Sequence, residues 1–501
     1  MSRVDVAIVG GGHNGLTAAA YLAAAGRSCT VLERRGELGG AAVSERPFAG
    51  VDARLSRYAY LVSLLPASIV RDLGIAAELR LARRPVSSYT PDPRDPGRGL
   101  LVDDRELGAL RDFSAATAGV ARALFPTLTE PLRSREEVRA LVADDAVFDA
   151  LFEAPLGVAI DAAFSDDLVA GVVLTDALIG TFAQAHGDDL RQNRCFLYHV
   201  IGGGTGDWLV PIGGMGVVSG ALAGAARAAG ATLTTRAEVL AIEPDARGVD
   251  VRYTDGTTER ELRADQVLVN AAPAELQRLM GHPGSDDRPE GAQLKVNLLL
   301  ERLPRLHDPA VSPERAFAGT LHINETATQL QRAFDEAASG AIPTTPPCEA
   351  YCHTLTDPTI LDPSLRARGV HTLTVFGLHM PARLFADDPD AARADALAAT
   401  LRSIDSVLAE PIEDCLLHAP DGDVCLEVRT PLDIERELRM PGGHIFHRDL
   451  QWPFAEHADD VGRWGVETDN PRVLLCGAGA RRGGGISGIA GHNAAMALLR
   501  S

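Results

Sequence analysis

The sequence is poor in positive charge, and its basic residues are almost all arginine. The 501 residues include 48 lysines and arginines against 68 acidic residues, a formal net charge of −20, and Lys295 is the single lysine. Nucleic-acid binding needs clustered positive charge, so this balance argues against nucleic acid as a main partner. It also weakens attraction to anionic membranes by charge alone. A peripheral membrane contact of another kind stays open, and so does a homo-oligomer.

Cysteines are few and scattered. The seven lie far apart except for Cys348 and Cys352, a pattern that does not predict a disulfide framework in a chain of this length. No second pair of Cys or His residues has the spacing of zinc ligands. We therefore expect no metal site.

Long hydrophobic runs are missing as well. No stretch of about 18 uncharged apolar residues predicts a membrane span, because the apolar segment 19–25 is short and ends at Gly26. The first apolar run, residues 4–9, leads straight into glycines without a basic leader or a cleavage site. We expect a soluble, cytoplasmic protein, whose length suggests two to four domains.

A glycine-rich turn between a strand and a helix is present at the start. The β-prone run 4–9 precedes Gly10-Gly11-Gly12-His13-Asn14-Gly15, and residues 16–25 have a helical composition. Gly10 permits a tight turn, Gly12 lets the backbone approach a pyrophosphate, and Gly15 lets the helix pack on the sheet. The amides and the dipole of the helix start, at His13 and Asn14, favour a diphosphate. Glu33, after a second strand at 29–32, is placed to accept hydrogen bonds from an adenosine ribose.

The segment after Glu33 favours FAD over NAD. Arg34 and the doublet Gly39-Gly40, followed by Ala41, resemble the extended glycine signature of flavoproteins in the glutathione reductase structural class. The resemblance implies that the doublet lets the backbone pass near the diphosphate and that an arginine there adds charge. It implies FAD as the cofactor.

The C-terminus contains a second strand, glycine-rich turn and helix. A buried strand is expected at 472–476, and a last helix at about 490–499. FAD is long enough to use two such units, one for its adenosine diphosphate and one for its flavin. In the resembled class the second helix points its start at the flavin, where its amides stabilise negative charge. The expected cofactor contacts here are Gly477, Ala478, Gly485, Ile486 and Ser487.

The middle of the chain supplies a third part of the FAD domain. A helix ending at Gly230 is followed by short β-prone runs at 232–235, 238–242, 249–253, 260–262 and 266–270, with a hairpin signal at Asp255-Gly256. Val239 and Ala271 are the cofactor contacts expected from this part. The fold class is therefore α/β, a Rossmann-like FAD-binding domain with an inserted mixed α+β substrate domain. Residues 1–84, 207–288 and 465–501 are assigned to the first, and 85–206 with 289–464 to the second.

These motifs together resemble a known family. Residues 9–16, 33–42, 213–216, 295–297, 442–447 and 484–493 are similar to phytoene desaturase-related flavoproteins, within the wider amine oxidase superfamily. The branch is the one that holds carotenoid ketolases and the pyridine nucleotide-disulfide oxidoreductase domain-containing proteins. Residues 41–60 contain no cysteine, so thiol–disulfide chemistry at the flavin is not expected. Arg481 and Arg482 depart from many relatives, and we assign them to the substrate site, where they would favour an anionic group.

Three residues are candidate catalytic groups. Lys295 lies in a predicted strand at 293–300, and the resemblance to amine oxidases implies a lysine that is bound through water to flavin N5; a surface lysine is the alternative. His444 and His447 follow Gly442-Gly443 and are candidate proton carriers, with a structural role as the alternative. Arg57 and Tyr58 are candidate substrate contacts.

Three functions remain open at this stage. The first is an FAD-dependent dehydrogenase or oxidase that takes a hydride from a mainly apolar small molecule to flavin N5, since flavin carries the electrons and protein supplies position. The second is an amine or amino-acid oxidase that releases hydrogen peroxide. The third is an FAD-stabilised binding or assembly protein without turnover. Oxygen, a quinone or another acceptor is expected to reoxidise the flavin.

Overall fold

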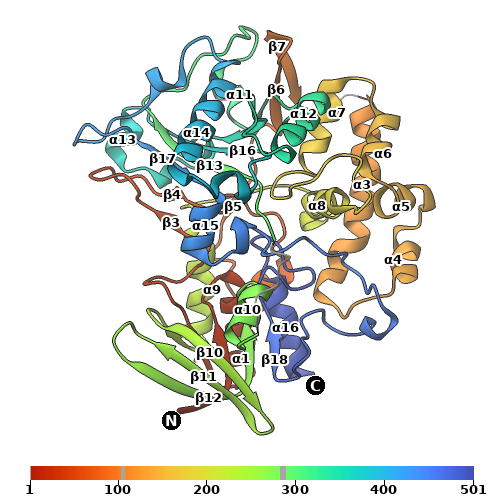
Figure 1. Ribbon diagram of the computed structural model, residues 1–501, viewed down its shortest axis with the longest axis vertical. Coiled ribbons are helices and arrows are strands. Elements are labelled where there is room, and N and C mark those ends of the chain that lie inside the picture. Colours follow the sequence, from red (N-terminus) through yellow and green to blue (C-terminus); the bar gives the residue numbers. More distant parts are fainter. Residues whose placement is uncertain (1, 103–107, 283–288, 501) are drawn as a thin grey trace.

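The computed structural model describes residues 2–102, 108–282 and 289–500. The described residues form two seven-stranded sheets, two small two-stranded sheets and a group of helices (Figure 1). One sheet occupies the end that holds the N-terminus. The second sheet and the helical group lie side by side at the other end (Figure 1).

The first sheet has a parallel core extended by an antiparallel hairpin. Its order is β10-β11-β12-β1-β2-β9, and β18 also pairs with β12. The pairings of β1 with β2 and β12, of β2 with β9, and of β12 with β18 are parallel. The strands are β1 (Ser2–Val9), β2 (Cys29–Leu32), β9 (Thr232–Thr234), β10 (Glu238–Asp245), β11 (Gly248–Thr254), β12 (Glu259–Val269) and β18 (Val473–Leu475).

One expectation for this sheet was wrong in detail. The sequence predicts two strands, at 260–262 and 266–270, but β12 runs unbroken from Glu259 to Val269. Residues 263–265, between the two predicted runs, stay in the strand because neighbouring strands pair there, with Arg3 of β1 opposite Arg263 and Val4 opposite Ala264. Pairing with a neighbouring strand therefore overrides the local loss of hydrophobicity.

Three helices cover this sheet: α1 (His13–Ala24), α9 (Gly216–Ala228) and α16 (Ile489–Leu499). Helix α1 packs against both α9 and α16. Small residues allow the close approach: a Cβ atom on Gly491 of α16 would lie 2.0 Å from the carbonyl oxygen of Asn14 in α1. The two glycine-rich turns that precede α1 and α16 are thus held next to one another.

The second sheet is mainly antiparallel. Its order is β17-β13-β16-β15-β14-β6-β7, with a parallel pairing only between β14 and β6. Every residue of β13, the strand next to the edge strand β17, is buried. The strands are β6 (Ser88–Asp92), β7 (Asp95–Val102), β13 (Leu294–Leu300), β14 (Thr320–Ile323), β15 (Cys348–Tyr351), β16 (His371–Gly377) and β17 (Leu426–Arg429).

The helical group lies beside this sheet, and its short helices begin at polar caps. The Ser134 hydroxyl and Glu137 form a capping box at the start of α4, and Asp144 and Asp166 cap α5 and α7. Such caps stabilise helices of eight or nine residues that would be marginal alone. The group comprises α3 (Gly108–Leu124), α4 (Arg135–Val142), α5 (Asp145–Phe152), α6 (Leu156–Ala163), α7 (Asp167–Thr175) and α8 (Arg191–Val200).

The remaining elements connect these parts. Helices α10 and α15 each begin with a proline. Helix α15 also has a capping box between Thr430 and Asp433. The elements are α2 (Ala67–Asp72), α10 (Pro273–Leu279), α11 (Pro313–Ala316), α12 (Ala327–Ala338), α13 (Pro363–Ala367), α14 (Pro389–Asp405), α15 (Pro431–Leu438), β3 (Ser44–Glu45), β4 (Leu55–Ser56), β5 (Leu81–Ala82) and β8 (Val210–Pro211). Within the described ranges, no helix combines the length and the apolar character needed to cross a membrane.

Candidate cofactor and substrate cavities

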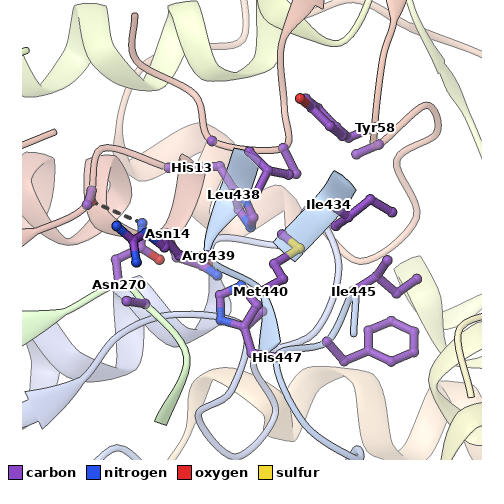
Figure 2. A pocket seen from close by; sticks show the side chains of 18 of the residues that line it. His13, Asn14, Tyr58, Asn270, Ile434, Leu438, Arg439, Met440, Ile445 and His447 are labelled. Carbon is purple, nitrogen blue, oxygen red and sulfur yellow. Dashed lines mark hydrogen bonds between the residues drawn. The ribbon is translucent and has the colours of Figure 1, made fainter. Parts of the chain in front are cut away.

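One cavity brings both glycine-rich turns together. Its walls include Gly12, His13 and Asn14 at the start of α1, and Gly485 and Ile486 in the turn before α16. These segments are more than 450 residues apart in the chain. Figure 2 shows His13 and Asn14 on one side of this cavity and Ile434, Met440 and Ile445 on the other.

The first turn has the geometry that a dinucleotide needs. Gly10 has a φ of +96°, which favours glycine. A Cβ on Gly15 would lie 2.3 Å from the carbonyl oxygen of Gly10, and one on Gly12 would lie 2.9 Å from the Asn270 amide nitrogen. Each of the three glycines is therefore required by space or by backbone conformation, as the spacing predicts.

The adenosine end is marked by Glu33. This buried carboxylate accepts hydrogen bonds from the backbone N–H groups of Gly11 and Arg35, both at 2.7 Å. It also lines the cavity, beside Val239. The carboxylate is therefore held in one orientation at the cavity wall, where a ribose diol can donate to it.

Buried polar atoms without partners also fit FAD. The Nε2 atom of His13 and both amide atoms of Asn14 are buried without a hydrogen-bond partner. Leaving such groups unpaired costs about 1–3 kcal/mol each. A diphosphate-containing cofactor in this cavity supplies the missing acceptors for the donors among them. The residues at the start of α1 therefore suit such a cofactor.

Most of the cofactor contacts expected from the sequence line this cavity. They are Gly10, Gly12, His13, Asn14, Glu33, Arg34, Gly40, Ala41, Val239, Ala271, Ala478, Gly485 and Ile486. Gly15, Gly39, Gly477 and Ser487 lie behind the wall. Gly477 packs on Asn270, and the Ser487 hydroxyl accepts a hydrogen bond from the N–H of Ile489 in the last helix. These four residues shape the turns.

Lys295 is a buried residue of the cavity wall, and the surface alternative for it is wrong. Its side chain is 1% exposed and donates hydrogen bonds to the carbonyl oxygens of Ser56, at 3.0 Å, and Tyr58. Its Nζ lies 5.3 Å and 5.1 Å from the ring centres of Tyr60 and Phe376. Burial lowers the pKa of Lys295 well below its ordinary value, with Glu427 opposing the shift and Arg57 adding to it.

The two candidate histidines occupy different places. His447 lines the cavity, its Nδ1 is buried without a partner, and burial lowers its pKa to about 4. His444 is not among the lining residues: its Nδ1 accepts a hydrogen bond from the N–H of Phe446, and its Nε2 lies 3.4 Å from Asp449. Of the two, the structure brings only His447 to the cavity.

The candidate substrate residues are mostly occupied elsewhere. Tyr58 lines the cavity and donates to Glu437, whereas Arg57 forms ion pairs with Glu45 and Glu427 outside it.

Arg481 and Arg482 lie away from the cavity. Arg481 donates to the carbonyl of Phe454 and pairs with Glu456, and Arg482 donates to the carbonyls of Thr127, Glu130 and Trp464. Neither arginine lines the first cavity, because both tie the turn after β18 to neighbouring loops.

Sequence reasoning missed much of the far wall. Asn270 donates from its amide to the Gly10 carbonyl at 3.1 Å and so braces the first turn (Figure 2). The position of Asn270 at the end of a strand, before small residues, could have indicated from the sequence that it belongs to the site. The rest of the wall gave no motif, because it comes from separate segments that only folding brings together. It includes Tyr60, Ile179, Tyr198, Trp208, Phe376, Ile434, Leu438, Arg439, Met440 and Ile445.

A second cavity of about 730 Å³ adjoins the first. Tyr60, Leu61, Ile179, His199 and Trp208 line both. The second cavity is much more polar in its residues, which include Arg84, Asp176, His322 and Glu349. A molecule bound at the first cavity thus has an apolar surrounding and a charged neighbouring chamber.

Comparisons with known proteins agree with this geometry. The family model described as flavin containing amine oxidoreductase matches residues 15–415. The uncharacterized protein Rv0897c of Mycobacterium tuberculosis is 52% identical, over 99% of this chain and 97% of its own length. The pyridine nucleotide-disulfide oxidoreductase domain-containing protein 2 of the mouse is 28% identical, over 99% and 93%.

A solved structure shares the fold at low sequence identity. Cyclohexylamine oxidase from Brevibacterium oxydans is 16% identical with a TM-score of 0.59, and 99% of each chain is covered. The expected α/β flavoprotein fold, the FAD cofactor and the relation to the amine oxidase superfamily and to the pyridine nucleotide-disulfide oxidoreductase domain-containing proteins are confirmed. The chain, with two distant glycine turns on one cavity, belongs to the flavin containing amine oxidoreductase family and is an FAD-dependent oxidoreductase.

Proposed function

We propose that the protein oxidises a mainly apolar small molecule by removing a hydride from one of its carbon atoms. FAD, when bound, supplies the chemistry by accepting that hydride at flavin N5. The observation that carries the proposal is the apolar wall beyond the second glycine turn. It is lined by Tyr60, Leu61, Ile179, Tyr198, Trp208, Phe376, Ile445 and Phe446.

This wall binds and orients a substrate by excluding water. Aromatic and branched side chains fill it, and specific sites combine such a surface with a few placed polar groups. The Tyr198 hydroxyl is one such group, since it is buried without a hydrogen-bond partner. A substrate that is apolar apart from one polar substituent satisfies both features.

Lys295 is the proposed proton acceptor at this wall. Two backbone carbonyls fix its Nζ, and burial favours its neutral form. A neutral amine has a lone pair, so it can accept the proton that a substrate N–H or O–H group releases on oxidation. His447, also neutral near pH 7, is the second proposed proton carrier.

Amine oxidation is the second candidate function. Tyr60 and Phe376 place aromatic rings beside Lys295, and family membership supports an amine substrate. The lowered pKa of Lys295 weakens any charge repulsion between its amine and the ammonium group of such a substrate. Release of ammonia distinguishes this candidate from carbon–carbon or carbon–oxygen oxidation, since hydrogen peroxide forms whenever oxygen reoxidises the flavin.

The test is anaerobic reduction of the bound flavin. The purified FAD-loaded protein is mixed with apolar alcohols, hydrocarbons and amines, and loss of the visible flavin absorbance is followed. We expect one chemical class to bleach the flavin, with oxygen or a quinone restoring the absorbance. An FAD-loaded protein that no class reduces would overturn the proposal and favour an FAD-stabilised binding protein.

Two variants test the role of Lys295. Lys295→Met removes the proton acceptor, and we expect bleaching to slow at least about 100-fold, the lower range for acid–base catalysis, with FAD retained. Lys295→Arg places a permanent cation at this position that cannot accept a proton, so it should be as slow as Lys295→Met. Recovery of the rate in Lys295→Arg would contradict proton acceptance and indicate a purely electrostatic role.

A further inference from the structure

A histidine and two glutamates meet in the wall of the second cavity. His322 in β14 and Glu349 in β15 are direct partners across the antiparallel pair, and Glu325 follows β14. The His322 Nδ1 lies 2.6 Å from the nearer Glu325 oxygen and 4.0 Å from that of Glu349. One ligand atom from each residue lies within 4.8 Å of the other two.

The cluster holds more negative than positive charge. The carboxyl groups of Asp176 and Glu349 interact with one guanidinium, that of Arg84, which donates to the Thr320 hydroxyl. Glu325 interacts with both of these carboxyl groups. Three carboxyl groups are thus gathered with a single guanidinium.

Raised pKa values and hydrogen bonds reduce the repulsion among these carboxyl groups only in part. Burial raises the pKa values of Asp176 and Glu349 to about 7, so neither is fully ionised near neutral pH. Glu349 also accepts hydrogen bonds from the hydroxyl groups of Thr175 and Tyr351. Glu325 is 0% exposed, and burial raises its pKa well above its ordinary value. Its Oε2 pairs with the His322 Nδ1 at 2.6 Å, whereas its Oε1 is buried without a partner.

The unpartnered oxygen points to a small occupant. His322 and Glu349 line the cavity, but Glu325 is not among the lining residues. The ammonium group of a bound organic molecule would therefore meet His322 and Glu349 before Glu325. A bare cation is small enough to touch all three.

We propose that His322, Glu325 and Glu349 bind a divalent first-row transition metal ion. One imidazole nitrogen and two carboxylates form a ligand set that Zn²⁺ and Mn²⁺ accept, and the two positive charges of the ion match those of two coordinating carboxylates. Bonds of about 2.0–2.2 Å set ligand atoms about 3 Å apart, so the three side chains need only small movements. The ion would link β14 and the turn after it to β15 and stiffen the wall of the second cavity.

Sequence inspection expected no metal site, and strand pairing is the reason for the difference. Glu349 lies 24 residues after Glu325, outside any familiar ligand spacing. Only the register of β14 and β15 brings it opposite His322.

Metal binding to the FAD-loaded protein is the test. The protein is dialysed against a chelator and then titrated with Zn²⁺ or Mn²⁺ by calorimetry, with metal content measured by mass spectrometry. We expect one equivalent per chain. His322→Gln and Glu325→Gln should each weaken binding at least about 10-fold, with flavin absorbance and melting temperature reporting that they fold.

His186→Gln is the matched control. His186 forms an exposed pair with Asp161 at 3.0 Å, so losing it removes a histidine–carboxylate pair outside the cluster and should leave metal affinity unchanged. If a cluster variant fails to fold, anomalous X-ray scattering from the metal-loaded wild type decides: a peak between His322 and Glu349 supports the site. A wild type that binds no more metal than His322→Gln, or a peak elsewhere, overturns the proposal.

Discussion

Replacing Gly15 by alanine tests the geometry of the first glycine turn. The new Cβ would lie 2.3 Å from the Gly10 carbonyl oxygen and 2.9 Å from the Asn270 amide nitrogen. Ordinary contacts begin near 3.4 Å, so α1 must move by about 1 Å or the turn must open. Such overpacking costs about 1–3 kcal/mol, and the helix preference for alanine over glycine offsets about 1 kcal/mol of it.

The displacement acts on the part of the cavity that holds the cofactor. Gly10, Gly12 and Asn14 line it, so we expect FAD affinity to fall about 10-fold for each 1.4 kcal/mol lost. Titration of the apoprotein with FAD, followed by quenching of flavin fluorescence, measures the affinity. Thermal unfolding of the apoprotein measures stability separately.

Gly224→Ala provides the opposite expectation for the same substitution. Gly224 lies within α9, is exposed, and has nothing within 4 Å of a Cβ. Alanine there should stabilise the protein by about 1 kcal/mol and leave FAD affinity unchanged. If Gly15→Ala binds FAD and melts like Gly224→Ala, the close approach of α1 to the turn is refuted.

Three further predictions concern other sites. Glu33→Gln should weaken FAD binding at least about 10-fold, because an amide replaces the carboxylate that accepts a hydrogen bond from Gly11 and faces the ribose. Fluorescence titration measures the affinity. An unchanged affinity would contradict the role of Glu33 in ribose binding. Arg482→Met should lower the melting temperature by several degrees, because three carbonyl groups lose their hydrogen-bond donor. The KM for the substrate should stay the same. A raised KM with an unchanged melting temperature would instead indicate a role in substrate binding. Burial lowers the pKa of His379 to about 3, below the ordinary 6.5, so the unfolded state binds more protons between these values and stability falls as pH drops through this window. Between pH 7 and pH 5 this group lowers the free energy of unfolding by about 2 kcal/mol. His379→Asn should remove this loss in denaturant unfolding, and asparagine tolerates the φ of 55° at this position. An equal loss of unfolding free energy in the wild type and the variant would disprove the prediction.

The sequence alone determined the cofactor and the half of the site that holds it. Gly10, Gly12 and Gly15 are recognisable because steric demands within a few residues select glycine, and Glu33 follows at the end of the next strand for an equally local reason. The turn at Gly485 was recognisable in the same way. Steric constraints between residues close together in the chain produce short sequence motifs that can be recognised.

Tertiary structure decided the rest. The substrate wall joins Tyr60, Ile179, Phe376 and Ile445 from separate segments, and each is an ordinary core residue in its own segment. Arg481 and Arg482 form a conspicuous pair in the sequence, yet both guanidinium groups donate hydrogen bonds to nearby backbone carbonyl groups. His322 and Glu349 became neighbours through strand register. Packing and pairing between distant segments leave no short-range signal, because any apolar or polar residue of suitable size satisfies each segment alone.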